Sequence, residues 1–134
     1  MLFDFMFKPV TQLSPIREML ALRFFKTVLA LSFLGWLVTV ILPTVRVLPV
    51  IYGKTAVPLH YNVHIGVDTV GPWWRIYLVP AVGLLIILCN AWLARYMWSR
   101  DQVLAYVAGF ATLVLQGILV TAMIFIVYLS LQYA

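Results

Sequence analysis

The chain has 134 residues, of which 65% are hydrophobic and 10% are charged. Soluble proteins contain roughly 45–50% apolar and 25% charged residues, so this composition excludes an ordinary water-soluble domain. The formal net charge of +5 comes from nine Lys and Arg against four Asp and Glu. These basic residues flank hydrophobic stretches and form no polar patch, which favours contact with anionic lipid headgroups and argues against a nucleic-acid partner.

The first segment, 1–23, precedes any hydrophobic stretch and is expected to be cytoplasmic or interfacial. Ser14 followed by Pro15 is typical of a helix start, because the Ser oxygen can accept from an unpaired N–H and Pro suits the first helical position. We therefore predict a helix that begins at 14 and runs without a break to 42.

Three hydrophobic stretches, 27–42, 76–94 and 103–129, contain no Lys, Arg, Asp, Glu or His. A helix needs about 20 residues to cross a hydrocarbon core about 30 Å thick. The first stretch reaches this length only if Phe24, Phe25 and Lys26 lie at one boundary and 43–45 at the other. The sequence thus predicts a single all-α integral membrane domain, 1–134, with three transmembrane helices at 24–45, 76–95 and 103–129, and a structured extracytoplasmic loop at 46–75.

The distribution of basic residues predicts the orientation of these helices. The N-terminal segment and the connection between the second and third helices share one side and carry six basic residues, which are Lys8, Arg17, Arg23, Lys26, Arg95 and Arg100. The loop between the first and second helices carries three, which are Arg46, Lys54 and Arg75. The positive-inside rule therefore places the N-terminus in the cytoplasm and the C-terminus outside.

Polar and small residues within the spans indicate how the helices contact one another, because a polar group facing lipid usually finds a partner. Counted from the cytoplasmic side, Ser32 lies level with Asn90, and Thr39 lies level with Gln116. The residues expected at interhelical contacts are Ser32, Thr39, Gly83, Asn90, Ala105, Ala108, Gly109, Thr112 and Gln116. They describe a three-helix bundle or, equally, a contact with another subunit, and a cofactor or transport role for Asn90 and Gln116 is the alternative.

Tryptophan residues at the span edges are typical of the aromatic belt, in which amphipathic rings lie at the headgroup level. Trp73 and Trp74 mark the outer start of the second span, and Trp92 and Trp98 mark its inner end. A cage for a cationic ligand is the alternative for Trp73 and Trp74. The single cysteine, Cys89, lies within the second span, so no disulfide can form within the chain.

The spans contain no ionisable Asp, Glu, His, Lys or Arg side chain that could relay protons or bind an ion. The chain also has no phosphate-binding glycine motif, zinc-ligand spacing, or paired nucleophile and base. We therefore expect no catalytic residue, no cofactor and no metal site. An enzyme or a transporter is the least favoured class.

The loop holds one distinctive group of residues, which are Pro58, His60, Tyr61, Asn62, Gly66, Asp68 and Gly71. Polar and apolar residues alternate over 60–65, which predicts a strand that ends in a turn at Gly66 and Asp68. In an extended strand His60 and His64 would be about 13 Å apart, too far to share a metal ion. We interpret the polar residues as structural, forming hydrogen bonds with the backbone of turns.

This loop resembles the signature of a bacterial membrane domain of unknown function that is often found at the N-terminus of SdpI-like toxin-immunity membrane proteins. In that signature a Pro precedes His-aromatic-Asn, and Gly, Asp and Gly follow. The resemblance covers about residues 24–95 and implies a bacterial cytoplasmic membrane, but it implies no defined activity. The sequence departs from the signature in the later position of Gly66 and in Pro72, Trp73 and Trp74 after Gly71.

From these features we expect a small non-catalytic integral membrane protein, an accessory or assembly subunit whose partners are the lipid bilayer and other membrane subunits or further copies of itself. The alternative is an extracellular peptide sensor or an immunity-type protein related to the SdpI family.

Overall fold

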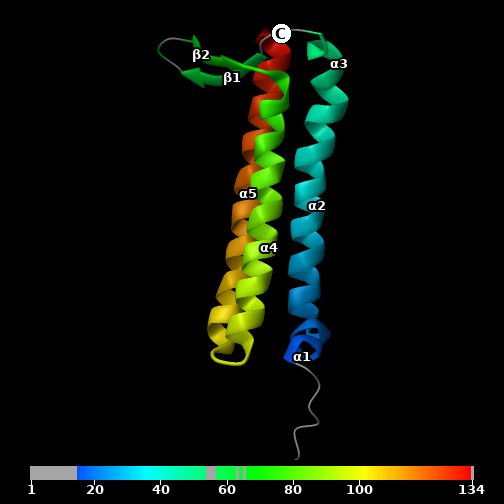
Figure 1. The fold of residues 1–134 in the computed structure, drawn as a ribbon, viewed down its shortest axis with the longest axis vertical. Helices are drawn as coiled ribbons and strands as arrows, with labels where there is room; N and C mark the ends of the chain where they lie inside the picture. The colour runs from blue at the N-terminus through cyan, green and yellow to red at the C-terminus, as the bar shows by residue number, and fades with distance from the viewer. Residues whose placement is uncertain (1–14, 54–56, 63, 65, 134) are drawn as a thin grey trace, which may run out of the picture.

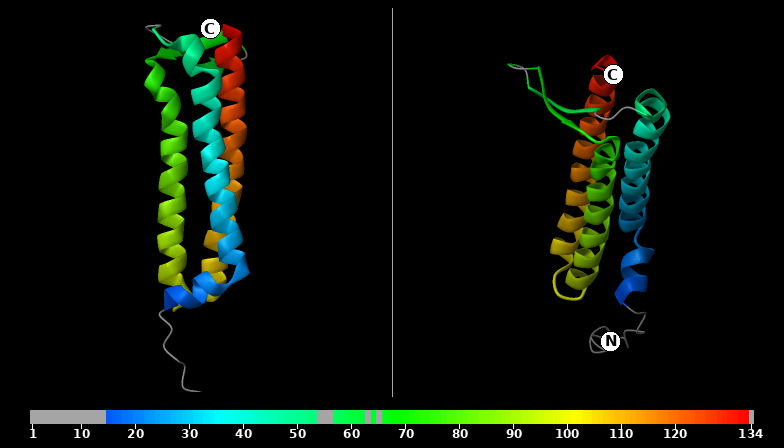
Figure 2. Two further views of the ribbon diagram at one scale, coloured as in Figure 1. Left: turned by 90° about the vertical axis from the view of Figure 1, so that its right-hand side faces the viewer. Right: turned by 45° about the horizontal axis from the view of Figure 1, so that its top comes forward.

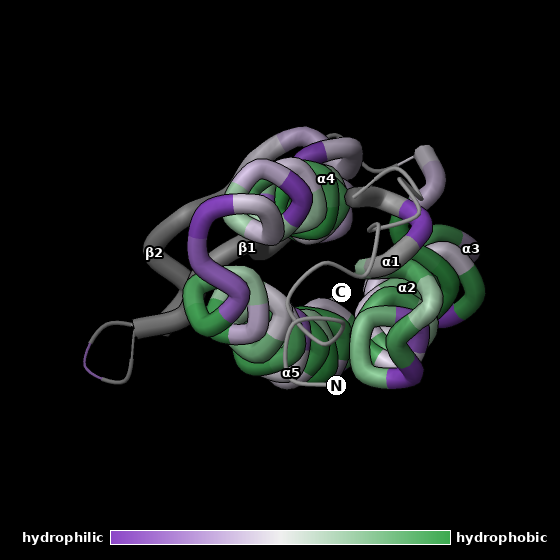
Figure 3. Tube along the Cα trace, turned by 90° about the horizontal axis from the view of Figure 1, so that it is seen from below, coloured by the Kyte–Doolittle hydropathy of each residue, from purple (hydrophilic) through white to green (hydrophobic). Residues whose placement is uncertain are grey.

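Three long helices dominate the computed structural model, which describes residues 15–53, 57–62, 64 and 66–133 (Figure 1). They are α2 (Arg23–Arg46), α4 (Leu78–Trp98) and α5 (Gln102–Tyr133). Viewed along their axes, the three helices surround a common centre (Figure 3). The described chain begins at one end of this bundle and finishes at the other, as three crossings require.

All three helices are long and apolar enough to cross a membrane. In the most apolar part of each helix, only 22% is buried inside the protein. Water would penalise so much exposed apolar surface, whereas a bilayer would not. A continuous apolar stretch can cross lipid only as a helix or as part of a closed barrel, because every backbone N–H and C=O needs a partner within the protein. The three helices support an integral membrane protein.

The prediction of one unbroken helix from 14 to 42 is wrong. Helix α1 (Pro15–Ala21) ends before α2, and Leu22 between them has an extended backbone with φ −73° and ψ 130°. Ser14 lies outside the described residues. Figure 2 shows α1 turned across the end of the bundle. This turn lets Met19 pack with Phe25 and Trp98. Leu22 stays hydrogen-bonded, because its N–H donates to the carbonyl oxygen of Met19 (3.2 Å) and its own carbonyl oxygen accepts from Lys26 (3.4 Å).

The connection between α2 and α4 contains more structure than the sequence indicated. Helix α3 (Leu48–Ile51) follows α2, and the short 3-10 helix η1 (Trp73–Tyr77) leads into α4. Between them, strands β1 (Val57–Asn62) and β2 (Gly66–Gly71) pair in antiparallel fashion. The hairpin extends sideways beyond the helices (Figure 1). Within the described ranges, β1 and β2 are thus the only strands, and all other regular elements are helical, so the expectation of an all-α chain is corrected by this hairpin.

Buried apolar residues form two clusters, one near each end of the bundle. The first consists of Met19, Phe25, Ala94, Trp98, Ala105 and Ala108. The second consists of Val47, Ile51, Ile76, Met123 and Val127.

Asp101 begins α5 by accepting hydrogen bonds from the backbone N–H groups of Val103 (2.9 Å) and Leu104 (3.4 Å), as a helix N-cap does. The connection between α4 and α5 can therefore be short.

Candidate interaction surfaces

Three polar contacts join the helices in the half of the bundle that carries the hairpin. Trp36 Nε1 on α2 donates to the carbonyl oxygen of Pro80 at 2.9 Å. Gln116 Nε2 on α5 donates to the carbonyl oxygen of Gly83 at 2.8 Å. In both cases a side chain from a neighbouring helix reaches the backbone of α4. A third contact joins the hydroxyl groups of Thr44 and Tyr77 at 2.9 Å.

Gln116 lies where α2, α4 and α5 meet. A Cβ atom added to Gly83 would lie 3.5 Å from both Nε2 and Oε1 of Gln116, and one added to Gly35 would lie 3.7 Å from its Cβ atom. Glycine on both neighbouring helices thus makes room for the amide side chain. Its Oε1 atom is buried and has no hydrogen-bond partner in the described part of the protein, and the same is true of Ser32 Oγ.

Thr39 and Thr112 form hydrogen bonds within their own helices and not the expected bonds to a neighbouring helix. Thr39 donates to the carbonyl oxygen of Trp36 at 2.7 Å, and Thr112 donates to that of Ala108 at 2.8 Å, so both bond within their own helices. Such bonds satisfy a hydroxyl group locally and require no partner helix. Gln116 contacts Gly83 and lies beside Gly35.

Small residues on α5 allow close contact with α2, as their spacing indicated. Ala105, Ala108 and Gly109 are buried. A Cβ atom at Gly109 would lie only 3.1 Å from Phe24 Cε1, which is the tightest approach at any described glycine. Larger side chains at these positions would push the two helices apart.

Asn90 is half-buried and lines a small cavity between the helices. The cavity has a volume of about 30 Å³ and also borders Met19, Val28, Gly109 and Thr112. This space suffices for about one water molecule. It is too small for an organic cofactor, and Gln116 is not among the residues that line it.

Three of the four tryptophans expected at the membrane interface are exposed, and the fourth is not. Trp73, Trp74 and Trp92 lie on the surface, whereas Trp98 is only 9% exposed. The expectation that Trp98 is a surface anchor is therefore wrong. Its ring packs edge-on against Phe25 at 5.6 Å, because the bend at Leu22 places α1 and the start of α2 over the last turn of α4.

The loop residues singled out in the sequence lie on the hairpin. Pro58, His60, Tyr61 and Asn62 belong to β1, and Gly66, Asp68 and Gly71 belong to β2. The expected turn at Gly66 and Asp68 is wrong, because Gly66 pairs with Asn62 and the chain reverses between them. β-branched residues favour strands, so Val67 and Val70 are the sequence signal for β2. The strand predicted over 60–65 ended before them.

The strand pairing is irregular at the centre of this motif. Pro58 pairs with Val70, His60 with Thr69, and Tyr61 with Val67, so Leu59 on β1 and Asp68 on β2 are skipped in turn. The hairpin therefore brings His60 and Asp68 to neighbouring positions across the two strands. No group of three or more His, Cys, Asp or Glu that could hold a metal ion occurs among the described residues.

One surface feature was missed in the sequence. A shallow groove on the outer side of α5 is lined by Val114, Gly117, Ile118, Thr121, Ala122 and Phe125. A Cβ atom at Gly117 would meet no atom within 4 Å, and Thr121 Oγ1 donates to the carbonyl oxygen of Gly117 at 2.9 Å. Gly117 and Thr121 are small residues four positions apart, and this spacing is the sequence signal for the groove.

Comparison with known proteins identifies no relative: no protein-family model, curated protein or solved structure matches the chain. The resemblance of the hairpin sequence to SdpI-like proteins therefore stays a prediction.

Proposed function

We propose that this chain is a small non-catalytic integral membrane protein that acts as an accessory or assembly subunit through helix and loop contacts. The observation that carries the proposal is the groove around Gly117 on α5. Its glycine exposes backbone on the outside of a membrane-spanning helix, flanked by Val114, Ile118 and Phe125. Small residues at such a position let a second helix approach closely, and van der Waals contact is the main source of affinity between helices in lipid.

The experiment compares Gly117→Ile with Ala30→Ile, a control on the exposed surface of α2. Each protein is purified in mild detergent, and the mass of the complex is measured. We expect the wild type and the control to carry a stoichiometric second subunit, either another protein or a second copy, and Gly117→Ile to lose it. A monomeric wild type, or a complex that Gly117→Ile leaves intact, would refute the proposal.

The proposed location is a bacterial cytoplasmic membrane, with the N-terminus in the cytoplasm and the hairpin and C-terminus outside. The six-to-three excess of basic residues supports this orientation. Cysteines introduced near Lys8 and near Thr69 test it in intact cells with a reagent that does not cross membranes. We expect labelling near Thr69 only, and labelling near Lys8 alone would show the opposite topology.

A second candidate is a sensor or immunity-type protein whose hairpin binds an extracellular peptide. The observation that favours it is the sideways extension of β1 and β2 beyond the helices, since an isolated pair of strands has marginal stability in water and gains from a further strand (Figure 1). A protein that is monomeric alone and binds a partner only when a peptide is added would support this candidate over the first.

A further inference from the structure

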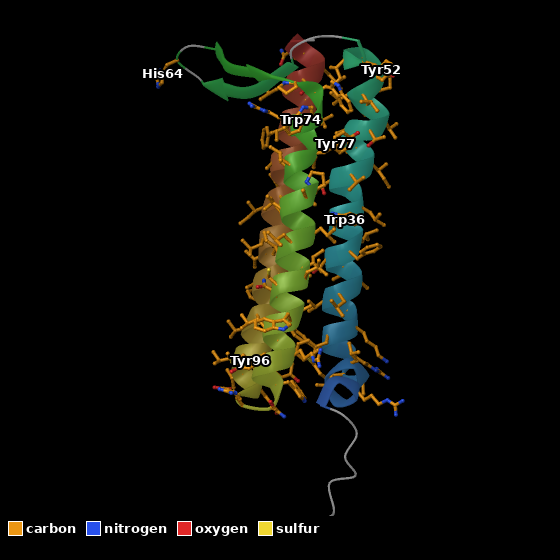
Figure 4. The ribbon with its side chains drawn as sticks, in the orientation of Figure 1. Trp36, Tyr52, His64, Trp74, Tyr77 and Tyr96 are labelled. Atoms are coloured by element: carbon orange, nitrogen blue, oxygen red, sulfur yellow. The ribbon has the colours of Figure 1, made fainter. Side chains whose placement is uncertain are left out.

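An exposed column of side chains lies along the end of α4 that faces α1. Trp92 and Tyr96 lie one above the other on α4 at a four-residue interval, and Arg100 lies in the turn that follows the end of α4 at Trp98. The rings of Trp92 and Tyr96 are stacked, with centroids 5.8 Å apart and planes at 9°. The Arg100 Cζ atom lies 4.5 Å from the centre of the Tyr96 ring. Figure 4 shows Tyr96 near the end of the bundle opposite to Trp74.

The column is open to the surroundings. Trp92 is 66% exposed and Tyr96 is 43% exposed. Neither ring therefore contributes to the core, in contrast to the buried Trp98 on the same helix. A stacked pair of aromatic rings with a guanidinium group above it holds the charge in one place while leaving its N–H donors available.

Arg100 keeps its charge available for a ligand. Asp101, the one carboxylate whose side chain the structure describes, accepts hydrogen bonds from the backbone of Val103 and Leu104 and forms no ion pair with Arg100. Arg95, Arg23 and Lys26 add positive charge at the same end of the bundle, where hydrophilic residues gather (Figure 3). An anionic group is the partner that this charge distribution favours.

An apolar surface continues from the column toward the centre of the span. A shallow groove there is lined by Leu88, Cys89, Asn90, Trp92 and Leu93. At a rise of 1.5 Å per residue, Leu88 and the end of α4 at Trp98 are about 15 Å apart along the helix, and Arg100 follows in the next turn. Half of a hydrocarbon core about 30 Å thick measures about 15 Å, so the column and the groove together match one leaflet.

We propose that this surface binds one anionic phospholipid of the surrounding bilayer, with its phosphate at Arg100 and one acyl chain along Trp92 and the groove. The charge at one end and the apolar groove at the other require a ligand with both features, which a free phosphate ion lacks. Under the proposed topology the lipid belongs to the cytoplasmic leaflet, although the site itself depends neither on that orientation nor on the proposed subunit function.

Native mass spectrometry of the full chain in mild detergent tests the site. The protein is titrated with dioleoyl phosphatidylglycerol or with dioleoyl phosphatidylcholine. We expect phosphatidylglycerol to bind more tightly, and Arg100→Gln to weaken its binding about fivefold, which corresponds to about 1 kcal/mol for one basic residue near the membrane surface. Millimolar glycerol 3-phosphate should not displace the lipid if the acyl chain contributes.

The matched control is Arg75→Gln. Arg75 also lies over an exposed ring, with its Cζ atom 5.9 Å from the centre of Trp74, but at the opposite end of the bundle. We expect this variant to bind phosphatidylglycerol as the wild type does. Tyr96→Leu removes the ring beneath the guanidinium group and should weaken binding as well, which provides a second test if Arg100→Gln lowers the melting temperature.

Three results of the phospholipid titrations would overturn the proposal. These are equal affinity for the two lipids, unchanged phosphatidylglycerol binding in both Arg100→Gln and Tyr96→Leu, and an equal loss of binding in Arg75→Gln. Displacement of the lipid by glycerol 3-phosphate would show a phosphate site without an acyl groove and would also refute it.

Discussion

Single Gly→Ala substitutions at Gly35, Gly109 and Gly117 separate helix propensity from packing. Alanine is favoured over glycine by about 1 kcal/mol in the interior of a helix. All three residues lie within long helices, so each substitution should gain a similar amount from propensity. Any difference in stability between the variants therefore reports the space around the new methyl group.

That space differs sharply between Gly109 and Gly117. The added Cβ atom at Gly109 would lie 3.1 Å from Phe24 Cε1. The Phe24 ring is held edge-on against Phe25 at 5.2 Å and at a tilt against Tyr106 at 4.9 Å. Because this ring has little room to move, we expect an overpacking cost of about 1 to 3 kcal/mol. At Gly117 no atom of the chain itself lies within 4 Å, so no such cost applies in the monomer, for which the comparison is made.

Gly35 is an intermediate case that serves as a control. Its added Cβ atom would lie 3.6 Å from Val120 Cγ2 and 3.7 Å from Gln116 Cβ, which are ordinary van der Waals distances. We expect Gly35→Ala to be as stable as Gly117→Ala and Gly109→Ala to be about 1 to 3 kcal/mol less stable than either. Reversible unfolding by SDS in mixed micelles, followed by circular dichroism, measures the difference. Equal stability of Gly109→Ala and Gly117→Ala would refute the packing of α5 against Phe24.

Three further predictions concern polar contacts. Gln116→Met loses an interhelical hydrogen bond worth about 0.6 kcal/mol. It also removes a buried oxygen without a hydrogen-bond partner, which destabilises the wild type by about 1 to 3 kcal/mol. The SDS unfolding midpoint of this variant should therefore be unchanged or higher. A clear drop in that midpoint would contradict this reasoning. Trp36→Phe removes the hydrogen bond to Pro80 and should lower the free energy of unfolding by about 0.6 and at most about 1.7 kcal/mol. The same change at the exposed Trp92 should have no effect. Equal losses in the two variants would count against the bond to Pro80. From the sequence motif, His60→Ala or Asp68→Ala should lower thermal stability by about 1 to 3 kcal/mol, and zinc should leave the melting temperature of the wild type unchanged. A rise in that temperature on adding zinc would favour a metal site.

The sequence alone was sufficient to locate the three long helices. The hydrophobic stretches at 27–42 and 103–129 lie within α2 and α5, and the stretch at 76–94 begins at the end of η1 and continues in α4. The reason is local, because a long apolar stretch in lipid must satisfy its backbone hydrogen bonds within itself, whatever its neighbours are. Spacing also placed Ala105, Ala108 and Gly109 on one side of a helix, and all three are buried.

Only the tertiary structure decided which residues these surfaces meet. Gln116 makes an interhelical hydrogen bond, as the sequence indicated, but packing decided that its acceptor is the Gly83 carbonyl oxygen on α4. Trp98 packs inside, although the sequence favoured lipid headgroups for it. A polar or aromatic residue near a span edge has the same local sequence whether it faces a neighbouring helix or lipid. The choice depends on how each helix is rotated about its axis, and packing against the other helices sets that rotation. The break at Leu22 arose in the same way, since the apolar contacts of Met19 with distant parts of the chain favour a bend that local helix propensity does not.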